Sequence, residues 1–181
     1  MSLIKRFLPL LILSLLAAAV LAGCGSKDPS AGGTSTAQAN SKQAPDFYVE
    51  TLDGTMTSLS DMKGKPLVIN FGASWCGPCQ LEAPVIASMY NKYKDRVNFF
   101  GMAVQDRKED ALAFAHKSGF TYRIGLDPNG DVAYDYQKAA KVPYGGIPMT
   151  IFINRNGDIV DYYLGPLNEQ QFEQRVSKIL N

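Results

Sequence analysis

The sequence predicts an α/β domain with a central mixed β-sheet flanked by helices. Two segments, Leu67–Ala73 and Val97–Val104, are apolar on both faces, as strands are in a sheet covered on both sides. Each of these two segments is followed by a segment whose pattern predicts a helix. Two later strands, Met149–Ile153 and Ile159–Leu164, are joined by "NRNGD", whose Asn-Gly pair is typical of a β-hairpin. This hairpin adds antiparallel pairing to the sheet.

Three helices are expected. The first runs from Cys76 to about Lys94, with an apolar face of Ile86, Met89, Tyr90 and Tyr93. The second covers Lys108–Ser118 and ends at Gly119, a favoured residue after a helix. The third opens with Asn168 and Gln171, which resemble a capping box. Its apolar stripe is Phe172, Val176, Ile179 and Leu180.

The chain between the second helix and the hairpin is harder to interpret. Tyr122–Leu126 is expected to be a short strand, followed by the turn "DPNG". The same residues superficially suggest a calcium loop, but Lys138 stands where the closing glutamate should be, so a turn is preferred. Tyr136–Gly146 is longer than the expected link, and it either shapes partner choice or is a neutral insertion.

The amino-terminal residues predict export. Residues 1–23 carry a short positive head, Lys5 and Arg6, and then the apolar run Phe7–Ala22, the layout of a secretory signal. Small residues directly precede Cys24, as in a bacterial lipobox, so we expect a lipid on the Cys24 thiol. The alternatives are a free Cys24 after cleavage, or an uncleaved anchor helix. Residues 24–44 have no aromatic side chain and predict a flexible tether, which leaves 45–181 as one domain.

Charge and the cysteine count limit the possible functions. Removing the signal takes away Lys5 and Arg6 and no acidic residue, which leaves 16 basic and 17 acidic residues, a net charge of −1. A near-neutral domain gives no electrostatic reason to expect binding to nucleic acid or to anionic lipid surfaces. Lipidation of Cys24 would leave Cys76 and Cys79 to act as a pair outside the cytoplasm. We expect this domain to be a monomer.

Three interpretations of the Cys76–Cys79 pair compete. A zinc site needs four ligands, but there is no second Cys-X-X-Cys motif and His116, expected on a helix surface, is the only histidine. A structural disulfide across so short a loop would stabilise little. A redox pair explains more, because a helix N-terminus favours the Cys76 thiolate. Gly77 and Pro78 suit the turn, so Cys76 is expected to be the exposed attacking thiol and Cys79 the deeper resolving thiol.

"WCGPC" after a buried strand resembles the thioredoxin superfamily. Pro84 matches the proline inside that family's active-site helix, and "GGIPMTIFI" matches its cis-proline loop, with Pro148 as the cis-proline. The segment from Pro45 to Phe71 resembles the amino-terminal extension of the TlpA/ResA-like branch. The resemblance covers Pro45–Asn181. It implies a thioredoxin-like fold with an N-terminal extension, and a membrane-tethered, extracytoplasmic thiol-disulfide oxidoreductase, several of which serve cytochrome c maturation.

The resemblance also implies roles for single residues. The Ile147 backbone would pair with an incoming peptide, and Pro148 would keep metals off the cysteines. Trp75 would offer an apolar docking surface, with plain core packing as the alternative. Thioredoxin carries a buried aspartate where this chain has Asn70. The branch has a glutamate at the position of Glu82, which we expect to titrate with the dithiol; an exposed acid without a catalytic part is the alternative. Asn70 would then only satisfy neighbouring backbone groups.

The sequence therefore predicts a lipid-anchored protein that reduces disulfides in exported proteins and receives electrons from a membrane partner. No metal, nucleotide or flavin site is visible, so the redox-active disulfide and the lipid are the only expected prosthetic features. A disulfide oxidase or isomerase on the same fold is the nearest rival. A peroxiredoxin-like peroxidase would need a proline and a threonine where Ile69 and Ala73 stand. A non-catalytic client-binding module is the rival from another class.

Overall fold

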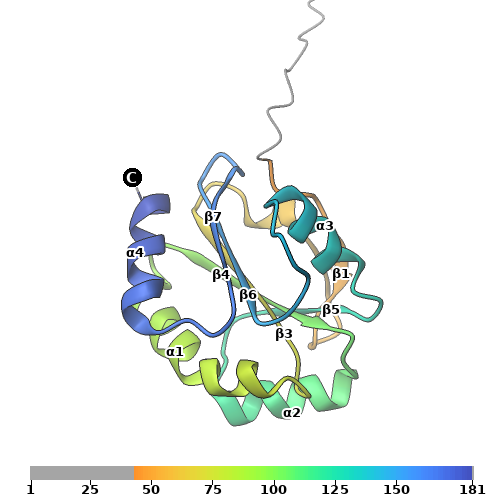
Figure 1. Ribbon diagram of the computed structural model, residues 1–181. Coiled ribbons are helices and arrows are strands. Elements are labelled where there is room, and N and C mark those ends of the chain that lie inside the picture. The colour runs from red at the N-terminus through yellow and green to blue at the C-terminus, as the bar shows by residue number, and fades with distance from the viewer. Residues whose placement is uncertain (1–42, 181) are drawn as a thin grey trace, which may run out of the picture. The chain divides into compact units, whose positions relative to one another are not determined.

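A computed structural model describes residues 43–180 (Figure 1). The predicted signal, Cys24 and most of the predicted tether lie outside these residues, so they stay predictions. The structured part begins two residues earlier than expected. Gln43 forms a β-bridge with Asp158, and the Ala44 amide donates to the Gly157 carbonyl at 2.9 Å, so both residues belong to the domain and not to the tether.

Five strands form the central mixed sheet, in the order β5-β4-β3-β6-β7. The strands are β3 (Leu67–Gly72), β4 (Asn98–Val104), β5 (Ile124–Asp127), β6 (Met149–Ile153) and β7 (Ile159–Leu164). β3, β4 and β5 run parallel to one another, whereas β6 is antiparallel to both β3 and β7. The predicted mixed sheet with its antiparallel hairpin is therefore confirmed, with β3 in the middle.

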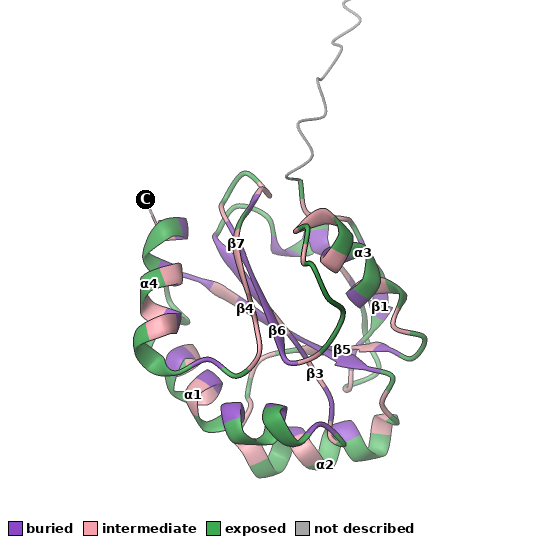
Figure 2. Cartoon of the chain, viewed as in Figure 1, coloured by how far each residue is buried: buried purple, intermediate pink, exposed green. Residues whose placement is uncertain are grey.

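Helices cover both faces of this sheet (Figures 1 and 2). They are α1 (Gly77–Tyr93), α2 (Lys108–Ser118), α3 (Asp131–Ala139) and α4 (Glu169–Leu180). Alternate residues of β3 divide between two cores, because successive strand side chains point to opposite faces. Val68 packs with α1 and α4, whereas Ile69 and Phe71 pack with α3 and the amino-terminal segment.

The local signals for the helix ends are confirmed. Gly119 follows α2 in the left-handed conformation, with a φ of 68°. Asn168 and Gln171 exchange two hydrogen bonds, 3.0 Å from the Asn168 amide to Gln171 Oε1 and 2.9 Å from the Gln171 amide to Asn168 Oδ1. This pair satisfies amide donors that the start of α4 would otherwise leave open.

The prediction for residues 136–146 was wrong in part, because helix α3 occupies its first residues. The expected turn at "DPNG" is also the start of this helix. Asp127 is 3% exposed, and its carboxylate accepts hydrogen bonds from the amides of Val132 and Ala133 at 3.3 and 2.9 Å. α3 then places Ala133 and Tyr136 in the core.

The amino-terminal extension forms a small hairpin of its own, β1 (Tyr48–Glu50) with β2 (Met56–Ser58), followed by the 3-10 helix η1 (Leu59–Met62). Thr51 forms a β-bridge with Gly125 of β5. The extension therefore lies against the β5 edge of the sheet and contributes Phe47 and Val49 to the core beneath α3.

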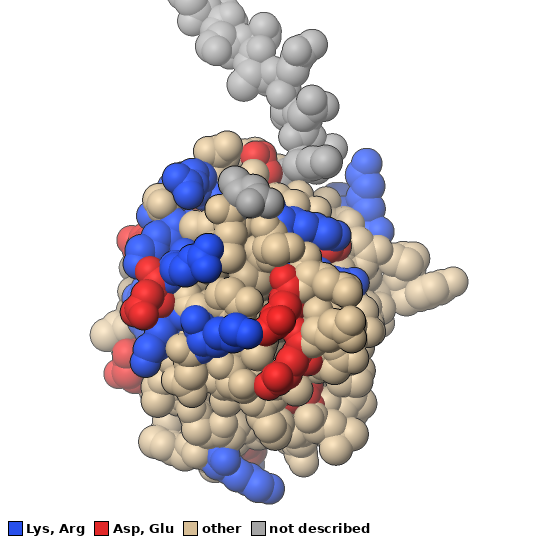
Figure 3. Space-filling view, turned by 90° about the vertical axis from the view of Figure 1, so that its left-hand side faces the viewer, with Lys and Arg blue, Asp and Glu red and all other residues tan. Residues whose placement is uncertain are grey.

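The face that carries α4 has basic and acidic side chains interspersed (Figure 3). Lys92 of α1 pairs with Glu173 of α4, and Lys178 of α4 pairs with Asp161 of β7 at 2.7 Å. Side chains of opposite charge therefore neutralise one another locally on this face. Exposed pairs of this kind contribute little to stability, typically up to about 1 kcal/mol each.

Tyr136 yields a stability prediction. Its side chain is fully buried against Phe71 and Phe47, and its hydroxyl has no hydrogen-bond partner among the described residues. Because a buried hydroxyl without a partner costs free energy, Tyr136→Phe should raise the free energy of unfolding by about 1 kcal/mol. Chemical denaturation of both proteins measures this change. A loss of more than about 1 kcal/mol would show that the hydroxyl has a partner that stabilises the fold.

Candidate active site

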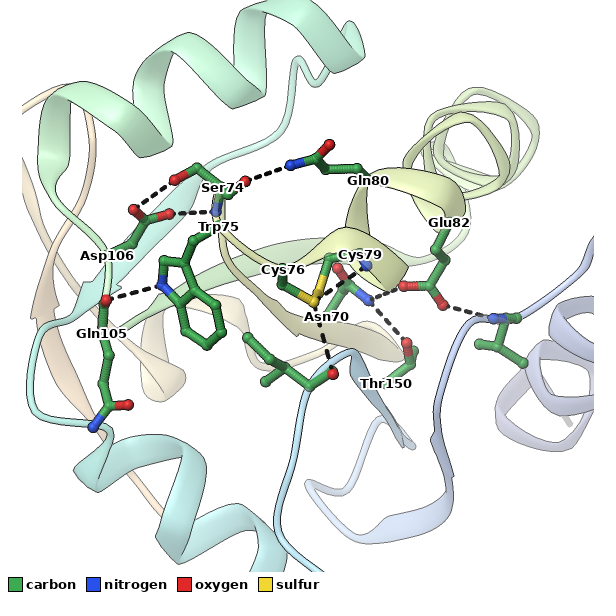
Figure 4. Close-up of a disulfide and its surroundings, with 12 residues drawn as sticks. Asn70, Ser74, Trp75, Cys76, Cys79, Gln80, Glu82, Gln105, Asp106 and Thr150 are labelled. Carbon is green, nitrogen blue, oxygen red and sulfur yellow. Dashed lines mark hydrogen bonds between the residues drawn. A yellow bond between two sulfur atoms is a disulfide. The ribbon is translucent and has the colours of Figure 1, made fainter.

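The two cysteines lie where β3 passes into α1, and they form a disulfide (Figure 4). Cys76 is the N-cap of α1, and the Cys79 amide donates to its sulfur at 3.2 Å. Gly77 and Pro78 occupy the first two helical positions, where no amide donor to the preceding turn is needed. In the dithiol this amide and the positive end of the helix dipole would stabilise a Cys76 thiolate.

The expected difference in exposure between the two cysteines is wrong for this disulfide form. Cys76 and Cys79 are each only 5% exposed. Ala73 and Ile147 pack against the pair and cover it. A client sulfur must therefore reach the pair past Ala73 and Ile147.

The loop before Cys76 is held by the segment that follows β4. Asp106 accepts hydrogen bonds from the Ser74 amide at 2.6 Å and from the Ser74 hydroxyl at 2.8 Å. The Gln105 carbonyl accepts from the Trp75 indole at 3.0 Å, and Gln105 has a left-handed backbone with a φ of 49°. Such a conformation is costly for a residue with a side chain, and here it turns the carbonyl toward Trp75. Trp75 is 59% exposed, so core packing does not describe it.

Sequence reasoning missed Gln105 and Asp106. Both directly follow a buried parallel strand, at the same sheet edge as the end of β3. Polar residues at this edge are common in the sites of α/β proteins, and that signal was available.

The loop that ends at β6 lies on the other side of the disulfide. The Ile147–Pro148 peptide bond is cis, in agreement with the resemblance. The Ile147 carbonyl oxygen lies 3.7 Å from Cys76 Sγ. A disulfide sulfur carries no proton, so this is a close contact in the oxidised form. In the dithiol, the Cys76 thiol can donate to the same oxygen.

Glu82 is buried in the first turns of α1, and the exposed alternative is wrong. It is 2% exposed, and each carboxylate oxygen accepts one hydrogen bond. The Leu167 amide donates to Oε1 at 2.9 Å, and Asn70 Nδ2 donates to Oε2 at 3.1 Å. Burial raises the pKa of Glu82 to about 7, although both hydrogen bonds act to lower it. Glu82 is therefore a carboxyl group that titrates near neutral pH.

The expectation that Asn70 would bond to neighbouring backbone groups was wrong. Its side-chain amide donates to Glu82 and to the Thr150 hydroxyl, the latter at 3.0 Å. Thr150 is fully buried on β6, directly opposite Asn70 in register. Sequence reasoning missed Thr150, because strand pairing across 80 residues is not visible in the sequence.

An open groove of about 430 Å³ begins beside Trp75 and Ile147. α3 forms its opposite wall with Tyr134, which is 64% exposed, and with Gln137. Of the described residues that line the groove, Asp131 alone has a charged side chain. The groove thus offers aromatic and amide surfaces next to the disulfide.

Within residues 43–180 no cluster of metal-ligating side chains is present. His116, the only histidine of the chain, is exposed on α2, as expected. In the same part of the chain, no helix combines the length and the apolar character that crossing a membrane would require.

This fold, with a Cys-X-X-Cys disulfide at a helix N-terminus beside a cis-proline, defines a thioredoxin-like thiol-disulfide oxidoreductase. The chain belongs to the AhpC/TSA family, whose model matches residues 41–162.

Known proteins agree with this class. The chain is 32% identical to the thioredoxin-like protein YneN of Bacillus subtilis (strain 168), over 75% of this chain and 77% of YneN. It is 31% identical to the thiol-disulfide oxidoreductase ResA of Geobacillus kaustophilus (strain HTA426), over 80% of each chain. A solved thiol:disulfide interchange protein of the thioredoxin family, from Chlorobium tepidum TLS, superposes with a TM-score of 0.68 at 25% identity, over 77% of this chain and 97% of that one. The predicted thioredoxin-like fold and its ResA-like relationship are confirmed.

Proposed function

We propose that this oxidoreductase works as a reductase, transferring two electrons from the Cys76–Cys79 dithiol to disulfides of exported proteins. The observation that carries the proposal is the placement of Cys76. Its sulfur receives an amide hydrogen bond at the start of α1 and faces the cis-proline loop, an arrangement that favours an attacking thiolate. The Gly-Pro pair between the cysteines also resembles reducing members of the superfamily.

The reaction has two exchange steps. The Cys76 thiolate attacks one sulfur of a client disulfide, which forms a mixed disulfide and releases the other client sulfur as a thiolate. Cys79 then loses its proton and attacks Cys76 Sγ. This second step closes the Cys76–Cys79 disulfide and releases the client as a dithiol. The proton from Cys79 has a nearby acceptor in Glu82, whose pKa of about 7 allows it to take up and return a proton at neutral pH.

The client segment next to its cysteine would lie in the groove between Trp75 and α3. The Ile147 backbone borders this groove, where it would pair with an extended peptide. Residues 66–81 and 142–154 contain no charged side chain. Because both segments surround the disulfide, we expect clients to dock through apolar contacts and backbone hydrogen bonds.

The amino-terminal sequence supports a site of action at a membrane surface. A lipid on Cys24 and a tether over residues 24–42 would hold the domain at the outer face of a bacterial membrane. Outside the cytoplasm, repeated reduction needs a source of electrons, so we include a membrane protein that reduces the Cys76–Cys79 disulfide. Apocytochrome c is one client class compatible with the ResA-like relationship.

Trapping of the mixed disulfide tests the proposal. In protein carrying Cys24→Ser, the further substitution Cys79→Ser removes the resolving thiol, so the adduct between Cys76 and a client should accumulate. Non-reducing electrophoresis and mass spectrometry of extracellular-side proteins identify the adducts. The matched control carries both Cys76→Ser and Cys79→Ser and should form none. Absence of adducts with Cys79→Ser, or equal adducts in the control, would contradict the proposed order of attack.

A further inference from the structure

Asn70 lies at the centre of the sheet, on the face covered by α1. Its register partners are Thr150 on β6 and Gly101 on β4. The amide nitrogen, Nδ2, makes two hydrogen bonds on the β6 side, to Glu82 Oε2 and to Thr150 Oγ1 (Figure 4). An ionised carboxylate can only accept, so an ionised Glu82 requires the nitrogen of Asn70, and not its oxygen, to face it.

The amide oxygen of Asn70 lies beside Gly72, the position that the sulfur of the resolving cysteine also approaches. A Cβ atom placed on Gly72 would lie 3.6 Å from Cys79 Sγ and 3.8 Å from Asn70 Oδ1, so the sulfur and the oxygen border the same point. Within residues 43–180 no group donates a hydrogen bond to this oxygen. The amide thus has its nitrogen on Glu82 and its oxygen next to Gly72, where the sulfur of Cys79 is also close.

A small cavity of about 30 Å³ adjoins the amide on the α2 side, lined by Asn70, Gly72 and Asp106 among others. Gly101, beside Asn70 on β4, contributes no side chain there. The volume exceeds the roughly 10–15 Å³ that one water molecule needs. Either end of the amide can therefore find a water partner on this side, because water both donates and accepts.

The side-chain amide of Asn70 can hydrogen-bond to its partners in two opposite orientations. When Glu82 is protonated, its hydroxyl can donate, and the oxygen of Asn70 can accept. The Thr150 hydroxyl accepts from Nδ2 in the first orientation and donates to Oδ1 in the second, because a hydroxyl does both. In the second orientation Nδ2 points toward Gly72 and the sulfur of Cys79. An amide donor there stabilises a thiolate, whereas an amide oxygen destabilises it.

We propose that Asn70 is a positioning residue whose side-chain amide turns over when the Cys79 proton moves to Glu82. The Cys79 thiol becomes a thiolate, the Glu82 carboxylate becomes a carboxylic acid, and the total charge of the site is unchanged. The turned amide donates to the new thiolate and accepts from the new acid, so the transferred proton is stabilised at both ends. This inference rests on the proposed reductase chemistry, in which Cys79 must lose a proton to resolve the mixed disulfide.

The other groups around Glu82 do not compete for this proton. From the 165–168 loop the Leu167 amide donates to Oε1 and cannot accept. Tyr122, ahead of β5, has its pKa raised by burial and by the nearby Glu82 charge, and therefore stays neutral. Tyr90 also lies near Tyr122, on α1. Within the described residues no lysine, arginine or histidine forms an ion pair with Glu82. A pKa of about 7 for Glu82 agrees with a proton acceptor that Cys79 can use.

The test measures the acid dissociation constant of the Cys79 thiol, in the full-length chain in detergent. All proteins carry Cys24→Ser and Cys76→Ser, so Cys79 is the only thiol, and the pH dependence of its alkylation rate gives the constant. Four proteins form a cycle: this parent, Glu82→Gln, Asn70→Leu, and both substitutions together. With Asn70 present, Glu82→Gln removes a charge and also lets the amide turn its nitrogen to the thiolate. With Asn70→Leu, only the charge effect remains.

We expect Glu82→Gln to raise the acid dissociation constant of the Cys79 thiol, and thus to lower its pKa. The rise should be roughly tenfold larger with Asn70 present than with Asn70→Leu, because one hydrogen bond to a charged group has about that effect. An equal or larger effect in the Asn70→Leu background would overturn the proposal, because a fixed amide or simple charge repulsion gives that result. Glu109→Gln in the parent is the matched control; it removes a charge from a side chain that is 75% exposed on α2, so it should leave the acid dissociation constant of Cys79 unchanged. Circular dichroism checks that each variant folds.

A second measurement does not depend on the variants at Asn70 or Glu82. In the reduced protein with only Cys24→Ser, nuclear Overhauser contacts between the Asn70 side-chain NH₂ and the Gly72 α-hydrogens should appear when Glu82 is protonated and vanish when it is ionised. A single orientation at every pH contradicts the proposal. Neither experiment uses a client or an electron donor, so a failure here is distinguishable from a failure of the proposed reductase function.

Discussion

Replacement of Cys76 by serine is expected to abolish disulfide reduction, with kcat/KM lower on the order of 10⁴-fold or more, as for other lost nucleophiles. The amide of Cys79 and the N-terminus of α1 stabilise a thiolate at this position, but a serine hydroxyl stays protonated at neutral pH and cannot form a disulfide. The measurement is the rate at which an unfolded disulfide-containing protein is reduced with dithiothreitol as the electron source.

The parent for this comparison carries Cys24→Ser alone, so that each protein differs at one cysteine of the site. Cys79→Ser, reduced beforehand and freed of dithiothreitol, should consume only one client per molecule through Cys76, because no thiol is left to resolve the mixed disulfide. A Cys76→Ser protein that keeps its rate within about tenfold of the parent would rule out the exchange mechanism. Retained biological function without Cys76 would favour the client-binding module instead.

Glu82→Gln is expected to change how stability depends on pH. The ordinary pKa of a glutamate is 4.5, and the pKa of Glu82 in the folded protein is about 7. Between these values the folded state holds a proton that the unfolded state has released, so the parent loses stability as pH rises through this window. The loss amounts to about 3 kcal/mol and is complete above pH 7. Glutamine does not titrate, so the variant should not show this loss.

The measurement is the free energy of unfolding of the disulfide form, from urea titrations at several pH values between 4.5 and 8. The free energy of unfolding of the variant, relative to that of the parent, should rise by about 3 kcal/mol from the low to the high end of this pH range. Most of the rise should occur between pH 5 and 7. Glu109→Gln is the matched control, because its side chain is 75% exposed on α2. A constant difference between Glu82→Gln and the parent at every pH would show that Glu82 has an ordinary pKa.

Much of the fold was predictable, because its signals are local. The β6–β7 hairpin, the cap formed by Asn168 and Gln171, and the end of α2 at Gly119 depend on neighbours in the sequence. Helix α3 was missed because it has only a short apolar stripe. Its first turn is completed by Asp127, a buried carboxylate that reads as part of a turn when only the sequence is seen.

The candidate site divides in the same way. The Cys76–Cys79 pair, Pro148 and Glu82 follow from motifs and from helix spacing. The burial of Cys76 does not, because it depends on Ile147, which lies 71 residues away. Thr150 was missed for the same reason, since its partner Asn70 lies on a strand that pairs with β6 only in the fold. Asp106 was missed although its place directly after a buried parallel strand was a visible signal.

The direction of electron flow is the central claim, and the reduction potential of the Cys76–Cys79 couple tests it most directly. The potential is measured by equilibrating the protein with glutathione or dithiothreitol buffers and following the emission of Trp75, the only tryptophan of the chain. We predict a value toward about −270 mV, as in thioredoxin. A value toward about −120 mV, as in strongly oxidising relatives, would contradict this account and make the protein a disulfide donor.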